Sequence, residues 1–365
     1  MQLGFSVVFL CLYLWSIWIK SSMRIVPLME VSSNIRLYPY ANEELPRKRY
    51  HSNSSIIDEW MRLMGPPTKF HSNDSTFINE DPFPVDYLVN RNVNVCSTTS
   101  FLIMLYPIRL KDFNMRQLLR QAVPQNAIIR EKRINRVFVI AIDDNDRESI
   151  QRIRNESRFY GDIIISRHVD AYSRIAKSVW DGLMWIREHC SSALFAGKFD
   201  PDAVVFLGNL VSYLERAPTQ RYYGGREMGY FLRSRGNSHR KFECPNDYPY
   251  DRYVSYVGGP AALFSMDVVD YLVVGAEYEP LFIKNSDDIM LGALLNRVGI
   301  RPHKVESNCT FMILHSDDHG FYKDYRVLPD RVCVYHHVKS AALYAEIMEY
   351  YGNRVNGSVS AKWVV

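Results

Sequence analysis

Short apolar runs alternate with stretches of helical spacing along the middle of the chain. The apolar runs predict buried strands at 101–106, 136–142, 161–165, 193–197 and 203–207. The stretches of helical spacing predict helices at 114–121, 147–160 and 171–189. Strands that alternate with helices from 101 to 210 predict an α/β domain with a mostly parallel sheet.

Two of these helices carry further signals. Asp and Asn side chains at 143–146 can accept from the free N–H groups of a first turn, so they are expected to cap the helix that follows. The 171–189 helix places apolar side chains on one face, and we expect Trp180 and Trp185 to be buried there. We expect Glu156 and Asp162, near the end of the preceding helix, to have a structural role.

The N-terminal part of the chain has a different pattern. Leu3–Ile19 is apolar and uncharged, and its length is close to the lower limit of about 17–25 residues for a membrane-spanning helix. No basic residue precedes it, and Trp15 and Trp18 are typical of an interfacial aromatic belt, which favours an uncleaved anchor at 1–20 over a signal peptide. Lys20 and Arg24 follow this segment. Because basic residues favour the cytoplasmic side of a membrane, they argue for a cytoplasmic location of the chain beyond the anchor.

Proline, serine and asparagine are frequent after this segment. Residues 21–92 are therefore expected to form a stem with little regular structure, apart from one short helix at about 56–64. The folded domain is expected at 93–350, followed by a tail at 351–365.

Sequons and cysteines indicate the cellular compartment in which the protein matures. Five N-x-S/T sequons begin at Asn53, Asn73, Asn155, Asn308 and Asn356, which favours the secretory route and a luminal domain. Five cysteines lie beyond Cys11, and no C-x-x-C pair points to a structural zinc site. In an oxidising lumen they would form two disulfides and leave one thiol, with the pairing open; five reduced, buried cysteines are the alternative.

Composition narrows the class of protein. The chain has 365 residues, of which 47% are hydrophobic, so global disorder is excluded. The 44 basic and 40 acidic residues nearly balance, which argues against a nucleic-acid partner.

A short acidic segment separates the last two predicted strands. Lys198-Phe199-Asp200-Pro201-Asp202 contains two aspartates that can face one point, since alternate residues of an extended segment project to the same side. Such a pair can bind a divalent ion at the carboxyl end of a strand. The alternative is a simple turn, because Asp and Pro both favour turns.

A second acidic pair precedes an apolar helix at 290–296. Ser286 or Asp287 can cap this helix, and capping explains one acid. The adjacent Asp288 is then left to act as a general base.

These features belong to six motifs in order between about 101 and 350. The first two are FLIMLYPIRLKDFNMRQLLR, with an R-x-x-x-R helix at Arg116 and Arg120, and ESRFYGDII at 156–164. The next two are Val169-Asp170-Ala171-Tyr172, with Lys177, Trp185 and Cys190 beyond it, and Lys198–Asp202. The last two are Tyr253-x-x-Tyr256-x-x-Gly259, ending at Ser265, and Asp287-Asp288-Ile289, with Gly292, Leu295 and Gly299-Ile300 beyond it. In this order they resemble the β1,3-glycosyltransferases of glycosyltransferase family 31, the galactosyltransferase, N-acetylglucosaminyltransferase and Fringe-like group.

The resemblance implies a fold and an activity. It implies a GT-A nucleotide-sugar-binding sandwich in a single-pass type II Golgi membrane protein with a luminal catalytic domain. The implied reaction is inverting β1,3-type transfer of a hexose from a UDP-sugar to a glycan hydroxyl on a glycoprotein or glycolipid. A divalent cation, usually Mn²⁺, would bridge the aspartates and the donor diphosphate.

The resemblance also implies roles for single residues. Asp200 and Asp202 take the metal and nucleotide position, with Asp202 the more direct ligand, and Asp288 takes the general-base position. His336 resembles a histidine that completes the metal shell in some relatives, although the adjacent His337 is an equal alternative.

Other motif residues keep two interpretations. Arg116 and Arg120 are candidate nucleotide-binding residues that, like Lys177, contact either phosphates or structural carboxylates. Tyr253 and Tyr256 either stack on a sugar or belong to the core.

Departures from the motifs leave a second function open. Pro201 stands where the family has its middle aspartate, which removes one carboxylate and one N–H donor near the phosphates. The competing hypothesis is a catalytically weak or inactive membrane-tethered binding or scaffold protein on the same fold.

Overall fold

The computed structural model describes residues 87–89, 95–96, 98–143, 145–229, 252–278, 286–303, 309–313 and 324–355. The anchor expected at 1–20, nearly all of the stem expected at 21–92, and the tail expected at 351–365 beyond residue 355 lie outside these residues. Among the helices of the described part, none combines the length and the apolar character needed to cross a membrane.

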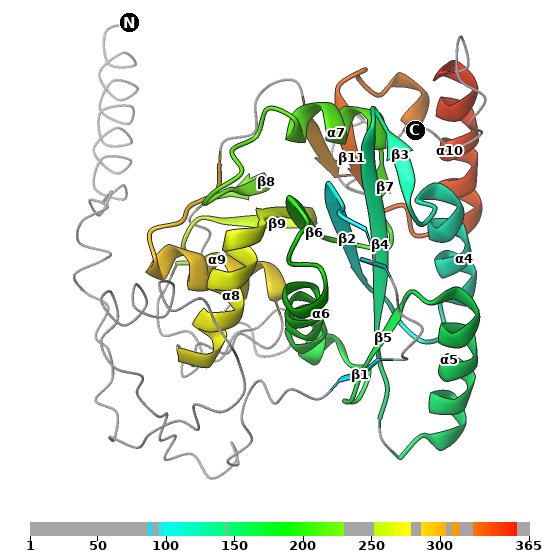
Figure 1. The fold of residues 1–365 in the computed structure, drawn as a ribbon. Helices are drawn as coiled ribbons and strands as arrows, with labels where there is room; N and C mark the ends of the chain where they lie inside the picture. The colour runs from blue at the N-terminus through cyan, green and yellow to red at the C-terminus, as the bar shows by residue number, and fades with distance from the viewer. Residues whose placement is uncertain are drawn as a thin grey trace, which may run out of the picture. The chain divides into compact units, whose positions relative to one another are not determined.

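The centre of the domain is an eight-stranded mixed sheet (Figure 1). Its four parallel strands, in sheet order, are β5 (Ile163–Ser166), β4 (Lys132–Ala141), β2 (Leu102–Pro107) and β6 (Phe195–Phe199). Its antiparallel strands are β1 (Tyr87–Val89), β3 (Ala127–Ile129), β9 (Tyr256–Ser265) and β8 (Tyr223–Met228). The expectation of a mostly parallel sheet is therefore correct for the centre and wrong for the flanks, where the strands pair antiparallel.

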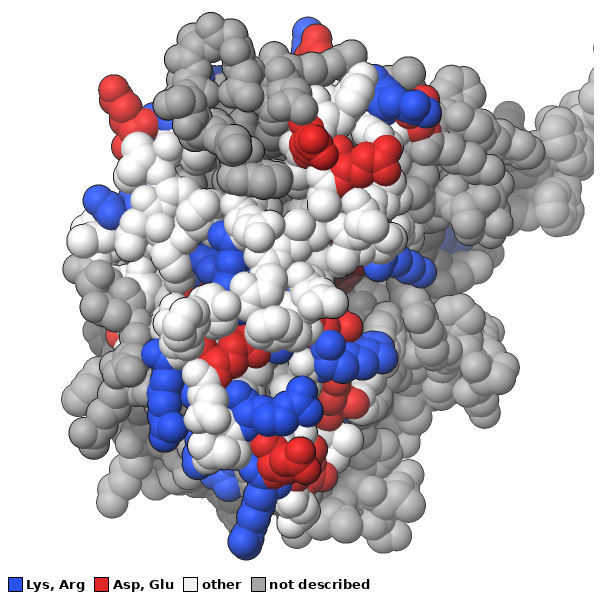
Figure 2. All heavy atoms as spheres, turned by 90° about the vertical axis from the view of Figure 1, so that its right-hand side faces the viewer, with Lys and Arg blue, Asp and Glu red and all other residues white. Residues whose placement is uncertain are grey.

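Helices cover both faces of the sheet (Figure 1). One face carries α4 (Phe113–Ala122), α5 (Arg147–Tyr160) and α10 (Ala341–Val355), and the other carries α6 (Ile175–His189), α8 (Met266–Tyr278) and α9 (Asp287–Arg297). A separate cluster of buried side chains fills each side, because the central strands are apolar on both faces. On the first face, basic and acidic side chains are interspersed (Figure 2).

A smaller sheet adds the C-terminal part of the chain to the domain. It consists of β10 (Thr310–Ile313), β11 (Val332–His336) and β7 (Val204–Val205), and α7 (Leu207–Leu214) follows β7. β11 pairs antiparallel with β7, with Val334 opposite Val205 and Tyr335 opposite Val204. This pairing brings the end of β11 beside the acidic segment that precedes β7.

Several predicted elements differ from the observed ones at their ends. The helix expected from 171 begins as the 3₁₀ turn η1 (Tyr172–Arg174), and α6 starts at Ile175. The strand expected at 203–207 is reduced to β7, because α7 already begins at Leu207. β6 runs on to Phe199, so Lys198 lies in a strand and not in a loop. β1 lies in the segment expected to be stem, yet it pairs with β5.

The cap predicted before α5 is confirmed. Asp146 accepts from the backbone N–H of Ser149 at 3.0 Å, and α5 ends at a left-handed Gly161 with φ 64°. Such a conformation favours glycine, which has no Cβ to clash.

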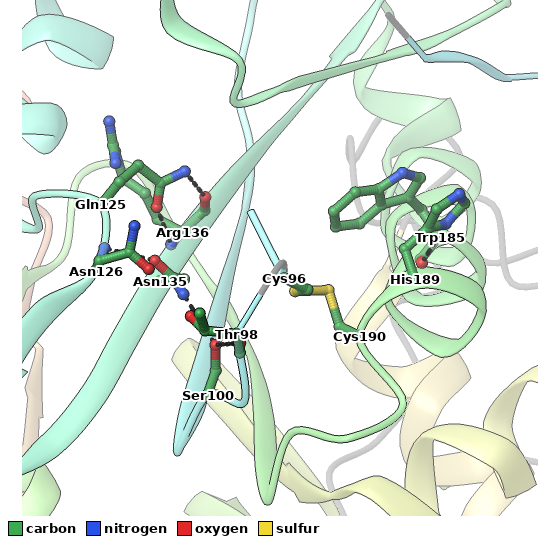
Figure 3. Close-up of a disulfide and its surroundings, with 10 residues drawn as sticks. All are labelled: Cys96, Thr98, Ser100, Gln125, Asn126, Asn135, Arg136, Trp185, His189 and Cys190. Atoms are coloured by element: carbon green, nitrogen blue, oxygen red, sulfur yellow. Dashed lines mark hydrogen bonds between the residues drawn. A yellow bond between two sulfur atoms is a disulfide. The ribbon is translucent and has the colours of Figure 1, made fainter. Parts of the chain in front are cut away.

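Two disulfides confirm the prediction from cysteine usage. Cys96–Cys190 joins the chain before β2 to the residue after α6 (Figure 3), and Cys309–Cys333 joins the residue before β10 to β11. The fifth cysteine, Cys244, lies outside the described residues. Both bridges are typical of a protein that matures in an oxidising compartment.

Candidate metal and catalytic site

The first acidic segment forms a turn directly after β6. The N–H of Asp200 donates to the carbonyl oxygen of Pro260 at 3.0 Å, and the carbonyl of Asp200 accepts from the N–H of Ala203 at 3.1 Å. The turn therefore stands at the carboxyl end of a central strand, where ligands bind in open α/β sheets. Pro201 occupies a position of the turn at which its fixed φ is favourable.

His336, the last residue of β11, faces both aspartates of this turn. Its Nε2 lies 3.1 Å from Oδ2 of Asp200 and 3.0 Å from Oδ1 of Asp202. The backbone N–H of Val338 donates to the carbonyl of Asp202 at 2.9 Å and fixes the two segments together. Of the two adjacent histidines, the structure brings His336 to the carboxylates; His337 has a left-handed backbone with φ 73°.

The three side chains have the composition of a divalent-cation site. One donor atom from each of Asp200, Asp202 and His336 lies within 4.8 Å of the others. Two carboxylates and one imidazole suit Mn²⁺ and similar ions of mixed oxygen and nitrogen preference. Burial opposes the charged imidazole, but hydrogen bonds to Asp200 and Asp202 outweigh it and raise the pKa of His336 to about 9. The proton on Nε2 thus stands where a cation would bind.

The second acidic pair lies at the start of α9. Ser286 is the N-cap and accepts from the N–H of Ile289 at 3.4 Å, so neither aspartate is needed as the cap. Asp288 Oδ2 accepts from the backbone N–H of Gly259 on β9 at 3.0 Å. Asp287 is buried.

Lys198 connects the two acidic groups. Its Nζ lies 2.7 Å from Oδ1 of Asp200, 2.8 Å from Oδ2 of Asp287 and 3.5 Å from Oδ1 of Asp288. The lysine side chain is 3% exposed. The two acidic segments are almost ninety positions apart in sequence, and one buried ammonium group holds them at one place. Sequence reasoning gave Lys198 no role, although a lysine inside an apolar strand is itself a signal, since a buried charge needs partners.

These contacts set the protonation of the site. Burial, together with Asp287 and Asp200, raises the pKa of Asp288 to about 7, against the opposing effects of Lys198 and the Gly259 N–H. Burial also acts on Asp200, but Lys198 and His336 outweigh it and hold its pKa below the usual value. The carboxylates, despite burial, keep the pKa of Lys198 well above its usual value. Asp200 is therefore ionised at neutral pH, whereas Asp288 is close to its midpoint.

Aromatic side chains line the region near Asp288. Tyr253 is buried and meets the half-buried Tyr256 edge-on, with ring centroids 6.3 Å apart. Burial and the nearby Asp288 raise the pKa of Tyr256 to about 12. Gly292 of α9 lies against Tyr256, because a Cβ at Gly292 would be 2.3 Å from the Cβ of Tyr256. Tyr253 thus belongs to the core, whereas Tyr256 is close enough to Asp288 for that carboxylate to raise its pKa.

The two arginines of α4 contact carboxylates of the fold, whereas we expected them to contact a nucleotide. Arg116 donates from Nε and Nη2 to Glu156 at 2.9 and 2.7 Å. Arg120 donates from Nε and Nη2 to Asp162 at 2.9 and 2.8 Å. Both guanidinium groups are buried in ion pairs within the fold, so the structural alternative replaces the expected phosphate contact. The same contacts give Glu156 and Asp162 the structural role that we expected.

Two further expectations concern α6. Lys177 is buried and forms an ion pair with Asp181 one turn later, which again replaces a phosphate contact by a structural one. Trp180 and Trp185 are each 1% exposed, and the prediction that they are buried is confirmed.

Comparison with known proteins places the chain in a family. Residues 114–306 match the family model described as Galactosyltransferase. Beta-1,3-galactosyltransferase 5 of Gorilla gorilla gorilla is 26% identical over 228 residues, which cover 62% of this chain and 76% of that protein. Beta-1,3-galactosyltransferase 1 of Homo sapiens is 26% identical over 227 residues, which cover 61% of this chain and 68% of that protein. Among solved structures, the galactosyltransferase LgtC with donor and acceptor sugar analogs has a TM-score of 0.34 at 12% identity, over 72% of this chain and 98% of that chain.

The family match covers just over half of the chain. The protein is therefore a glycosyltransferase. More narrowly, it belongs to the galactosyltransferase family, glycosyltransferase family 31, and the resemblance seen in its motifs is confirmed.

Proposed function

We propose that this protein is an inverting β1,3-type hexosyltransferase that moves a sugar from a UDP-sugar to a glycan hydroxyl. The observation that carries the proposal is the convergence of two distant acidic groups on Lys198, with Asp200 on one side and Asp288 on the other. Separate acidic groups fit the two charges of such a reaction, since the leaving diphosphate gains negative charge while the attacking hydroxyl loses a proton.

Asp200, Asp202 and His336 are the residues that would hold a divalent cation, with Mn²⁺ the first candidate. When bound, such a cation stabilises the negative charge on a departing diphosphate. The protein holds these three donors in place through the β7–β11 pairing and the contact between Val338 and Asp202. Because Lys198 also contacts Asp200, it keeps that carboxylate ionised and available as a ligand.

Asp288 would act as the general base. A carboxylate with a pKa of about 7 accepts a proton more readily than an ordinary aspartate and is still partly ionised at neutral pH. The Gly259 N–H holds Oδ2, and Lys198 lies on the Oδ1 side. Removal of the acceptor's proton opposite the leaving group fits a single displacement that converts an α-linked donor into a β-linked product.

We further propose the arrangement of the whole chain. Residues 1–20 would anchor the protein in the Golgi membrane, 21–92 would include a luminal stem, 93–350 would form a GT-A catalytic domain, and 351–365 would be a tail. The two disulfides support a luminal domain. The parallel β5-β4-β2-β6 centre with helices on both faces supports the nucleotide-sugar-binding architecture.

A transfer assay tests the proposal directly. The purified full chain would be incubated with Mn²⁺, a panel of UDP-sugars and an array of glycan acceptors. UDP-galactose is the first donor to test, because the similar proteins are named galactosyltransferases. We expect manganese-dependent transfer that Asp202→Ala abolishes and that an exposed control, Asp330→Ala, leaves unchanged.

The competing scaffold function is an outcome of the same experiment. If no UDP-sugar binds at millimolar Mn²⁺ and no sugar is transferred or hydrolysed, the enzyme proposal is wrong for this chain. Binding of UDP without turnover would point to a member whose Asp-Pro-Asp turn no longer supports catalysis.

A further inference from the structure

A cluster of buried charges lies on the α4 side of the main sheet. Arg116 and Arg120 extend from α4, Arg136 extends from β4, and Glu156 and Asp162 come from α5 and the segment that follows it. Each of these five side chains is at most 10% exposed. The charges on the surface of this face are solvated (Figure 2), whereas those of the cluster are withdrawn from water.

The charges of the cluster do not balance. Three guanidinium groups meet two carboxylates among the described residues. Arg116 and Arg120 are each held by both oxygens of a carboxylate. Among the described residues, the Arg136 guanidinium makes one hydrogen bond, from Nη2 to Oδ2 of Asp162 at 2.8 Å. Burial lowers the pKa of Arg136 to about 10, which still leaves it charged at neutral pH. Within the part of the chain that the structure describes, one buried positive charge therefore has no carboxylate to balance it.

The same cluster contains hydrogen-bond donors without partners. Within the described part of the chain, no acceptor meets Nη1 of Arg120, Nε and Nη1 of Arg136, or the hydroxyl of Tyr106. Burial raises the pKa of Tyr106 well above its usual value, so this hydroxyl keeps its proton and supplies no negative charge. Buried donors are nearly always paired, because an unpaired one forfeits its hydration without compensation.

The side chains that carry these donors surround one aromatic ring. Arg120 and Arg136 share the carboxylate of Asp162, and their guanidinium carbons lie 5.2 and 5.4 Å from the centroid of the Phe138 ring. The Tyr106 ring lies 6.0 Å from the same ring.

We propose that Arg120, Arg136 and Tyr106 bind a small monovalent anion, with chloride as the physiological occupant. An anion accepts hydrogen bonds from all of these groups and also neutralises the surplus charge. Water would satisfy donors but leave the charge unpaired. The ion is small because Arg120, Arg136 and Tyr106 are between 0% and 8% exposed, deep beneath α4.

The site would brace the strand that carries the acidic turn. The Tyr106 ring lies 5.7 Å from the ring of Phe199, the residue between Lys198 and Asp200. A fixed Tyr106 therefore supports the end of β6 on the face of the sheet that carries Phe199, opposite to the face that carries Lys198.

Thermal unfolding of the purified full chain tests the anion. The Tm would be measured in increasing sodium chloride, with sodium gluconate added to hold the ionic strength constant. We expect the Tm to rise by about 2–4 °C and to saturate. Arg136→Gln should remove the response, and Tyr106→Phe, which keeps the ring, should raise the chloride midpoint roughly tenfold.

Tyr222→Phe is the matched control. Tyr222 is equally buried, but its hydroxyl pairs with Tyr213 at 3.0 Å, so this variant should keep the wild-type response. Crystals grown in bromide should show an anomalous peak within hydrogen-bonding distance of Arg136. An identical wild-type Tm in chloride and gluconate, or a water molecule without anomalous signal at this position, would overturn the proposal.

Discussion

At the scale of single residues, the site is a balance of charges around Lys198. Three carboxylates share one buried ammonium group, and two of them also have other partners: His336 for Asp200 and the Gly259 N–H for Asp288. This difference in partners separates the acids. Asp200 is held ionised, and Asp288 is left near its midpoint, so two residues of one type acquire different chemistry.

The pH dependence of transfer follows from Asp288. Burial first, then the neighbouring carboxylates, raise its pKa to about 7, and a general base must be deprotonated to act. The rate should therefore fall about tenfold per pH unit below 7 and level off above about 8. Asp288→Asn should lower kcat by roughly 10²–10⁴-fold and remove this limb. A wild-type profile that is flat between pH 5 and 8 would exclude Asp288 as the titrating base.

Replacement of Lys198 should affect both stability and chemistry. Lys198→Met leaves buried carboxylates without their cation, which should lower the free energy of unfolding by about 3–5 kcal/mol. The pKa of Asp288 should rise further, because Lys198 opposes its upward shift. Urea denaturation and the pH–rate profile measure the two effects.

Lys132→Met is the control for this variant. Lys132 is 39% exposed and lies 4.0 Å from Glu215, so its loss should cost less than about 1 kcal/mol. Equal stability of the two variants would contradict the role given to Lys198.

At the scale of elements, the small sheet is what completes the site. β11 brings His336 to the turn after β6, and Cys309–Cys333 ties β11 to the chain that enters β10. The position of His336 thus depends on strand pairing and on one covalent bridge.

Removal of this bridge gives an element-scale prediction. A variant with Cys309→Ala and Cys333→Ala loses a link across 24 residues, which should lower the free energy of unfolding by about 3 kcal/mol. Because His336 follows Cys333 in β11, the same variant should bind Mn²⁺ more weakly, as measured by calorimetry. Removal of Cys96–Cys190, which joins the chain before β2 to the end of α6, should leave the Mn²⁺ affinity unchanged.

Much of the element order is readable from the sequence, because the central strands are apolar and Asp146 is a clear cap. The antiparallel flanks of the sheet cannot be read from the sequence in this way. β8 and β9 are separated by a long segment, and no local sequence pattern indicates how they pair. The residues of the candidate site also differ in whether the sequence indicates them. Asp200 and Asp202 stand out in sequence as acids between two apolar strands, and Asp288 stands out as the second acid before an apolar helix. The choice of His336 over His337 and the contacts of Lys198 depend on pairings between distant strands.

At the scale of the whole molecule, the cation site joins the middle of the domain, at Asp200 and Asp202, to its C-terminal part, at His336. A cation that binds only the folded chain stabilises it by mass action, by about 2.7 kcal/mol at a concentration of 100 times Kd. Millimolar Mn²⁺ should therefore raise the Tm of the wild type, and a chelator should reverse the effect. His336→Ala should largely lose the response. An unchanged wild-type Tm at saturating Mn²⁺ would argue against these three residues as ligands.

The distance in sequence between Asp202 and His336 has a consequence for biosynthesis. The ribosome releases the acidic turn well before the strand that faces it, so an unfinished chain carries only part of the ligand set. Tight cation capture must await the last strand of the domain. A premature stop codon between residues 266 and 336 would yield a product that retains the residues of the main sheet but lacks His336, which closes the ligand shell. Metal loading would therefore distinguish the completed chain from such a truncated product.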